Sequence, residues 1–266
     1  MAKGTVVLTG ASGGMGRAVR SLLEKEGCCV WALDISGDAD DKNYIRTDIT
    51  DEASVQAAAD HVASVSGNVD AVVHLAGIYD MNSLVEMPEE DFLRIFNVNL
   101  FGMYRVNKAF VPLLNPASRI VMVSSELAPL DPLPFTGIYA ITKSSIEKYA
   151  YSLRMELQLL GHSVSVVRPG AVKTPLLDVS QKRIEAFCDN TELYKDTSRR
   201  FLSIVNRVET ANVEPERLAA TVLRALEARR PRYVYKLNRS PLLLMMNMLP
   251  QRLQNYLIKR ILLPKK

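Results

Sequence analysis

Short apolar runs alternate along the whole chain with longer segments of helical periodicity. The runs of strand length cover residues 5–9, 29–34, 69–75, 119–124, 163–168 and 232–235, with a weaker one near 44–47. The segments that favour helices are 15–26, 52–65, 88–113, 138–160 and 215–228. Strands rich in Val, Ile and Leu that alternate with helices are typical of a parallel sheet covered on both faces. We therefore predict an α/β protein with a doubly wound parallel sheet in a single domain.

A glycine-rich turn follows the first predicted strand and leads directly into a helix. It reads Thr9-Gly10-Ala11-Ser12-Gly13-Gly14-Met15-Gly16. Glycines let the backbone turn sharply and approach a pyrophosphate, which the N-terminus of the helix attracts. Asp34 ends the second predicted strand, 24 residues after Gly10, where a carboxylate accepts hydrogen bonds from an adenosine ribose. The pattern predicts a Rossmann-type dinucleotide site formed by Gly10, Ser12, Gly14, Met15, Gly16 and Asp34.

The chain of 266 residues has the length of one large α/β domain. We assign residues 1–240 to a dinucleotide-binding and catalytic domain and residues 241–266 to a C-terminal tail. Within the domain, residues 172–213 form a charged segment too long for an ordinary connection, which indicates a lid or a substrate-binding loop.

The net charge of +4 is distributed unevenly. Residues 228–266 contain ten basic residues and no acidic one, which leaves 23 basic against 29 acidic residues in the rest of the chain. A nucleic-acid-binding protein is expected to spread basic residues over a face with interleaved aromatic side chains. The excess of basic over acidic residues is instead confined to the C-terminal end, so we predict no nucleic-acid partner. The tail needs a separate explanation.

The cysteines and the N-terminal residues bear on the cellular compartment. Cys28, Cys29 and Cys188 form no C-x-x-C pair and cannot all pair with one another, which favours a reducing environment. The first apolar run is too short for a signal peptide, and no run approaches the roughly 20 apolar residues of a membrane-spanning helix. We expect a cytoplasmic protein, and no metal ion at its site.

The spacing T-G-x-x-x-G-x-G resembles that of the short-chain dehydrogenase/reductase family, and further motifs follow in the same order as in that family. They are Leu75-Ala76-Gly77, similar to N-N-A-G; Asn97-Val98-Asn99-Leu100-Phe101-Gly102, similar to N-x-N-L-x-G; Ser124-Ser125; Tyr139-Ala140-Ile141-Thr142-Lys143, which matches Y-x-x-x-K; and Pro169-Gly170-Ala171-Val172-Lys173-Thr174, similar to P-G-x-V-x-T. The resemblance covers about residues 3–235.

The resemblance implies roles for these residues. Asn99, Ser125, Tyr139 and Lys143 are the expected catalytic residues, with Ser125 bonding the substrate oxygen and Asn99 holding a water that relays protons from Lys143. Lys143 is also expected to hold the nicotinamide ribose. The other expected cofactor contacts are Asp48, Ile49, Leu75, Ala76, Gly77, Tyr139, Pro169, Gly170, Val172 and Thr174.

Tyr139 and Lys143 are four residues apart, so on a helix they share one face. At about 4 Å and an effective dielectric constant near 20, an ammonium attracts a phenolate by roughly 4 kcal/mol. This attraction alone is worth up to ~3 pKa units, and desolvation opposes it. We therefore expect Lys143 to lower the pKa of Tyr139 and to make it an acid/base near neutral pH.

The chain departs from the family pattern at two places. His74 and Leu75 stand where N-N-A-G has two asparagines, and we interpret His74 as a structural histidine at a strand end. Ser125 precedes Tyr139 by 14 residues, whereas 13 is common, so strict spacing would put Glu126 at the serine position. A carboxylate cannot donate the hydrogen bond that a developing oxyanion needs, so we favour Ser125, with Ser124 pointing the other way.

The residues around Asp34 favour NAD(H) over NADP(H). A 2′-phosphate would face this carboxylate, and the neighbouring positions carry Gly13 and Ile35 rather than a basic residue. Arg17 is close in sequence but lies inside the first predicted helix.

The expected walls of the substrate site are apolar and belong to residues 127–135 and 172–213. The side chains in question are Leu130, Leu133, Phe135, Leu176, Leu177, Phe187 and Leu193. An apolar pocket fits a lipid-like alcohol or ketone, and the apolar, basic C-terminus looks like that of the hydroxysteroid and retinol dehydrogenase branch. Two alternatives stay open: an NADPH-dependent reductase of acyl or xenobiotic ketones, and a catalytically silent dinucleotide-binding regulator.

Two expectations concern partners. Related enzymes pair through the helices at 88–113 and 138–160, so we expect a homodimer or homotetramer. For the tail, one interpretation is packing on its own domain or on a neighbouring subunit, beside the mouth of the substrate site. The other is peripheral membrane contact through a helical side with Leu253, Tyr256, Leu257 and Ile261, while Arg252, Asn255 and Lys259 share the opposite side.

Overall fold

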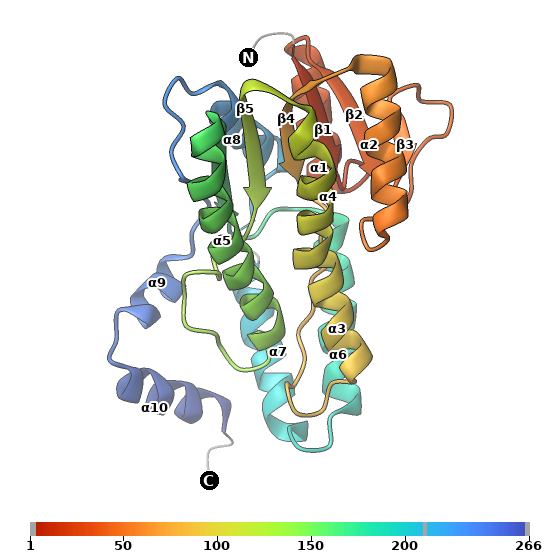
Figure 1. Cartoon of the computed structure of the whole chain (residues 1–266). Helices are drawn as coiled ribbons and strands as arrows, with labels where there is room; N and C mark the ends of the chain where they lie inside the picture. The colour runs from red at the N-terminus through yellow and green to blue at the C-terminus, as the bar shows by residue number, and fades with distance from the viewer. Residues whose placement is uncertain (1–3, 210–211, 264–266) are drawn as a thin grey trace.

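The computed structural model describes residues 4–209 and 212–263; for residues 175–181 and 207–209 only the backbone is described (Figure 1). Seven strands form one sheet in the order β3-β2-β1-β4-β5-β6-β7, and every neighbouring pair is parallel. The strands are β1 (Thr5–Thr9), β2 (Cys29–Asp34), β3 (Tyr44–Arg46), β4 (Val69–His74), β5 (Leu114–Val123), β6 (Ser163–Pro169) and β7 (Val234–Leu237). The strand order reverses between β1 and β4, so a crevice opens there at the carboxyl edge of the sheet.

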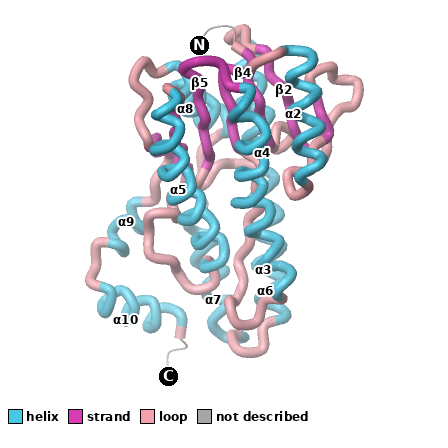
Figure 2. Tube along the Cα trace, viewed as in Figure 1, coloured by secondary structure: helices cyan, strands magenta, loops and turns pink. Residues whose placement is uncertain are grey.

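Helices cover both faces of this sheet, as Figure 2 shows. They are α1 (Gly14–Lys25), α2 (Glu52–Ser66), α3 (Glu89–Phe96), α4 (Gly102–Phe110), α5 (Gly137–Leu157), α6 (Pro175–Asn190), α7 (Lys195–Glu209), α8 (Pro215–Glu227), α9 (Pro241–Asn247) and α10 (Gln251–Leu262). One apolar core joins the sheet to α1 and α8, and the other joins it to α2, α4 and α5. The predicted Rossmann-type architecture is confirmed.

Several element boundaries differ from the sequence-based ones. β5 begins at Leu114, five residues early, because Leu114 pairs with Val69 before a bulge in β5, after which regular pairing starts with Arg119 and Ala71. β7 ends at Leu237 rather than at residue 235, because the chain keeps pairing with β6 until Asn238 turns it with a positive φ. The helix predicted at 88–113 is continuous but contains a π-helical turn, Asn97–Phe101.

The segment predicted as a lid or loop, 172–213, is largely helical. It forms α6 and α7, which pack against each other and contribute to a third apolar cluster with Met81, Phe187, Phe201 and Leu262. Leu262 belongs to α10, so the C-terminal tail closes this cluster. Figure 1 shows α9 and α10 on the outside of the molecule, with α9 to the left of the lower part of α5 and α10 below it.

Candidate active site

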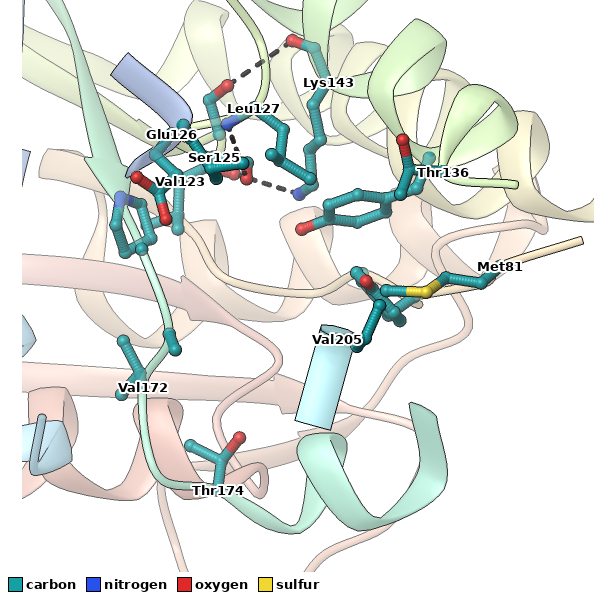
Figure 3. Close-up of a pocket in the computed structure, with 18 of the residues that line it drawn as sticks. Met81, Val123, Ser125, Glu126, Leu127, Thr136, Lys143, Val172, Thr174 and Val205 are labelled. Carbon is teal, nitrogen blue, oxygen red and sulfur yellow. Dashed lines mark hydrogen bonds between the residues drawn. The ribbon is translucent and has the colours of Figure 1, made fainter. Parts of the chain in front are cut away.

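The main pocket lies at the carboxyl edge of the sheet, where β4, β5 and β6 end. Ser125, Tyr139 and Lys143 all line it, and Figure 3 shows Ser125 and Lys143 on one side with Met81 and Val205 across the cavity. Most of the other lining side chains are apolar: Met15, Leu75, Ile78, Leu127, Leu133, Val172, Phe201, Ile204 and Leu243. The pocket therefore combines a small polar site with apolar walls.

Tyr139 projects from the first turn of α5 toward Ser125, which follows the last residue of β5 by two positions. Desolvation raises the pKa of Tyr139 above its usual value, and a hydrogen bond with Ser125 opposes that effect. The ring of Tyr79 lies against that of Tyr139, with 4.4 Å between the centroids. The phenol is thus protonated at neutral pH in this structure.

Lys143 lies one turn further along α5 and is buried. Its Nζ sits 5.4 Å from the centroid of the Tyr139 ring and donates a hydrogen bond to the carbonyl oxygen of Val123 at 3.3 Å (Figure 3). Burial lowers the pKa of Lys143 to about 8. The expectation that Lys143 lowers the pKa of Tyr139 is wrong for this state, because the ammonium lies over the ring face and desolvation of the phenol dominates.

The amide of Asn99 is fully buried on the π-helical turn. Its Oδ1 accepts from the backbone N–H of Ile78 at 2.8 Å, and its Nδ2 donates to the carbonyl of Ile78 at 2.9 Å and to Oγ1 of Thr142 at 3.2 Å. A Cβ added to Gly77 would lie 3.2 Å from Oδ1 of Asn99 and 3.8 Å from Nζ of Lys143. Asn99 thus ties the loop after β4 to α5, next to Lys143. Irregular π turns of this kind are frequent at functional sites.

The register of the serines can be read from their contacts. The hydroxyl of Ser124 donates to Oε1 of Glu147 at 3.1 Å, whereas that of Ser125 forms a hydrogen bond with Tyr139. The buried carboxylate of Glu126 accepts a hydrogen bond from the backbone N–H of Ser240 at 2.7 Å. The structure therefore brings Ser125, and neither neighbour, against the phenol.

The glycine-rich turn has no room for a side chain at Gly10 or Gly16. Gly10 has a φ of +70°, and a Cβ there would lie 2.5 Å from the backbone nitrogen of Ala76. A Cβ on Gly16 would lie 2.0 Å from the carbonyl oxygen of Gly10. α1 begins at Gly14, so its free N–H groups point into the crevice, which fits the pyrophosphate of a dinucleotide.

Asp34 lies at the end of β2 beside this turn. Its Oδ2 accepts from the backbone N–H of Ser12 at 2.9 Å, and its Oδ1 from that of Ser36 at 3.2 Å. Arg17 lies within α1 as predicted, but its guanidinium reaches back and donates to the carbonyl of Ser12. The guanidinium of Arg17 therefore lies nearer the ribose end of the crevice than we expected from the position of Arg17 inside a helix.

The remaining predicted cofactor contacts lie along the same edge. Asp48 is exposed and its Oδ1 accepts from Thr50, while the side chain of Ile49 is buried against Gly102. The backbone of Leu75 and Ala76 is held by Thr9, through the bond from Leu75 N to Thr9 O at 3.1 Å and that from Ala76 N to Thr9 Oγ1 at 3.4 Å.

The end of β6 and the segment that follows it border the pocket with Pro169, Gly170, Val172 and Thr174. A Cβ on Gly170 would lie 1.9 Å from the carbonyl oxygen of Asn238 and 2.7 Å from Oε1 of Glu126. Glycine is required here because the chain leaving β7 crosses directly over it. The C-terminal tail therefore starts at the pocket.

The predicted substrate walls are confirmed only in part. Leu133 lines the pocket, and the rings of Phe135 and Phe187 pack against each other at a tilt of 49°, with 4.9 Å between their centroids. Leu130, in the loop between β5 and α5, borders a different surface hollow, and Leu193, in the turn between α6 and α7, is exposed. Leu176 and Leu177 lie outside the described side chains.

Several lining residues were missed by sequence reasoning. Tyr79 and Met81 come from the loop after β4, Ile204 and Val205 from α7, and Leu243 from α9. They carry no motif, and only the fold brings them together. Two carboxylates connect the segment after β4 to α6 and the turn that follows it. Asp80 forms an ion pair with Arg183 at 2.7 Å, and Glu86 accepts from the backbone N–H groups of Glu192 and Leu193.

The described part of the chain contains no cluster of His, Cys, Asp and Glu suited to a metal ion, and no helix there is long and apolar enough to span a membrane. A doubly wound sheet, a glycine cradle at its crevice and a Tyr–Lys–Ser site at the carboxyl edge define a nicotinamide-dinucleotide-dependent oxidoreductase. Residues 4–185 match the family described as short chain dehydrogenase. The chain belongs to this family, whose members bind NAD(P)(H).

The known proteins that are similar to this chain are named for different activities. The chain is 26% identical over 229 residues to a 3-ketodihydrosphingosine reductase of Bacteroides thetaiotaomicron, covering 85% of this chain and 84% of that protein. It is 31% identical over 183 residues to a 2-dehydro-3-deoxy-L-rhamnonate dehydrogenase (NAD(+)) of a Sphingomonas species, covering 65% and 73%. The fold is similar to ligand-free aldohexose dehydrogenase of Thermoplasma acidophilum, with a TM-score of 0.74, 24% identity, and 90% and 96% of the two chains covered.

Proposed function

We propose that this protein is an NAD(H)-dependent oxidoreductase that interconverts an alcohol and a carbonyl on a hydrophobic, lipid-like substrate of steroid or retinoid character. The observation that carries the proposal is the pocket itself, in which Ser125, Tyr139 and Lys143 face a cavity walled mainly by apolar side chains. An apolar cavity with a few convergent polar groups fits a large apolar ligand that carries one reacting oxygen. The reductase of Bacteroides thetaiotaomicron, named for a sphingosine-derived ketone, supports a lipid-like substrate.

In the carbonyl-reducing direction, the protonated phenol of Tyr139 donates its proton to the developing alkoxide. Ser125 donates a second hydrogen bond to the same oxygen and orients it. Lys143, with its pKa lowered to about 8, gives up and regains a proton near neutral pH and so resupplies Tyr139. Asn99 holds the loop that borders this path. A bound nicotinamide supplies or accepts the hydride.

The cofactor preference rests on Asp34. Its carboxylate stands at the ribose end of the crevice and accepts from Ser12, so a 2′-phosphate there meets like charge. The second candidate function, an NADPH-dependent ketone reductase, draws its support from Arg17, whose guanidinium reaches the carbonyl of Ser12. A silent dinucleotide-binding regulator has no use for the Ser125–Tyr139 contact.

We also propose a homodimer or homotetramer. Exposed apolar side chains on the α3–α5 side, among them Phe101 and Tyr104, with Tyr151 and Met155 on α5, support pairing through these helices. Light scattering across micromolar concentrations tests this, and a monomer mass throughout contradicts it.

The activity is tested by a screen of hydrophobic secondary and primary alcohols with NAD⁺ and of the matching ketones and aldehydes with NADH, following the absorbance of the reduced cofactor. Sugars and short hydroxy acids serve as polar controls. Turnover that increases with the apolar size of the substrate is expected. Turnover restricted to the polar controls contradicts the proposed substrate class and leaves the reaction class intact.

A further inference from the structure

The C-terminal helix packs on the protein through a side other than its predicted apolar side. Sequence periodicity predicts that Leu253, Tyr256, Leu257 and Ile261 form the apolar side of α10. In the structure, Ile258 and Leu262 face the cluster formed with α7, and Gln254 is buried beside them. Leu253, Tyr256 and Ile261 are left exposed, Tyr256 at 57% of its surface. The helix therefore packs on the protein through another side, and most of the predicted apolar side faces outward.

The short helix α9 continues this exposed apolar surface. Leu242, Met245 and Met248 follow one another at intervals of three residues and are all exposed, Met248 at 85%. Leu243, on another side of the same helix, lines the pocket. One short helix thus has an apolar side in the pocket and an apolar side on the molecular surface.

α9 is held against the pocket at both ends. The backbone N–H of Ser240, which precedes it, donates to Glu126 at 2.7 Å. Asn247, its last residue, accepts through Oδ1 from the backbone N–H of Asp131 at 2.8 Å. Both partners lie in the loop between β5 and α5. The exposed residues of α9 therefore have a fixed position next to the pocket.

The charge of this surface has one sign. Arg252, Lys259 and Arg260 are exposed on α10 and, among the residues that the structure describes, none of them forms an ion pair. The sequence from 228 to 266 contains no acidic residue. Basic side chains interleaved with Leu, Met and Tyr are the composition of a surface that lies in the headgroup region of an anionic membrane.

We propose that α9 and α10 form a monotopic docking surface for an anionic lipid bilayer, which places the apolar pocket beside the membrane. The docking surface comprises the exposed residues Leu242, Met245, Met248, Arg252, Leu253, Tyr256, Lys259, Arg260, Ile261 and Leu263. A second copy of the chain is the less favourable occupant, because a two-fold contact sets these cations against their own copies. The proposal deepens the proposed function, since a lipid-like substrate dissolves in that bilayer.

Flotation of the full chain with vesicles tests the docking surface separately from catalysis. We expect binding to vesicles of phosphatidylglycerol mixed with phosphatidylcholine, little binding to phosphatidylcholine alone, and release by salt. Replacing Met248 and Tyr256 together by Glu removes binding. Arg252→Gln and Lys259→Gln each lower it about fivefold, which corresponds to ~1 kcal/mol per basic residue near the membrane.

The matched control is Leu159→Glu, which adds a charge at an exposed apolar residue following α5, away from α9 and α10, and is expected to leave flotation unchanged (Figure 1). Absence of flotation with every lipid composition overturns the proposal, as does binding that the double variant retains. Light scattering of the same variants identifies the alternative: an oligomer that dissociates in the double variant, without vesicle binding in the parent, assigns the surface to a second copy. Turnover with soluble substrate does not enter the test, so the proposed function can fail independently.

Discussion

The carboxylate of Glu126 accepts a hydrogen bond from the backbone N–H of Ser240, joining residues that are 114 positions apart. Glu126 follows Ser125 directly, and Ser240 caps α9 by accepting from the N–H of Leu243. Burial raises the pKa of Glu126, and the bond from Ser240 together with Arg239 opposes the shift. The pair connects the loop that carries the serine of the site to the helix that forms one wall of the pocket.

Glu126→Ala is expected to loosen α9 without unfolding the domain. A buried backbone N–H that loses its acceptor costs about 1–3 kcal/mol, and the partly buried N–H of Ser240 anchors a helix of seven residues. Hydrogen exchange at residues 240–247 should therefore accelerate. Glu126→Gln is the matched control, since its amide oxygen still accepts and the buried charge is gone. Equal exchange in the two variants would show that α9 is held by other contacts.

Tyr139→Phe is expected to lower turnover by about 10²–10⁴-fold, the range for loss of a general acid, with dinucleotide binding and the melting temperature largely retained. Ser125→Ala should also be severe, because Ser125 faces the phenol. Ser124→Ala should be mild, because Ser124 bonds Glu147 behind the site. Steady-state kinetics of the three variants check this order. A Ser124→Ala variant more impaired than Ser125→Ala would mean that the serine register is wrong.

The cofactor preference is expected to respond to two positions. Asp34→Ala with Ile35→Arg should shift the ratio of kcat/KM toward NADP(H), because like-charge repulsion is removed and a cation is supplied. Arg17→Gln should weaken any residual use of NADP(H), since its guanidinium already lies over the turn at Ser12. Tighter binding of NADPH than of NADH by the unaltered protein, measured by fluorescence titration, would contradict the role given to Asp34.

Sequence reasoning succeeded where local pattern and burial coincide. β1 and β2 match their predicted bounds because each is an unbroken apolar run inside the sheet. It failed where distant segments decide the outcome. Nothing local to α10 shows that Ile258 and Leu262 meet α7, and nothing near Gly170 shows that Asn238 crosses it. The pKa of Tyr139 was misjudged for the same reason, because desolvation depends on the whole pocket.

His74 provides a prediction about acid stability. It is buried at the end of β4, and its Nε2 lies 2.9 Å from Oδ1 of Asn107, which can only accept, so Nε2 carries the proton. Nδ1 has no hydrogen-bond partner in the described structure. Protonation would place a donor there without an acceptor, and burial lowers the pKa of His74 to about 4. The histidine is therefore neutral in the folded state.

Between pH 6.5 and about 4 the unfolded chain binds a proton at His74 that the folded protein does not, so the free energy of unfolding falls as the pH falls through this window. The slope from this one group approaches about 1.4 kcal/mol per pH unit. His74→Gln keeps a donor to Asn107 and cannot titrate, so its stability should depend less on pH there. Urea unfolding of both proteins at pH 7, 6 and 5 measures the difference. If the gap between them stays constant over these values, His74 does not couple protonation to folding.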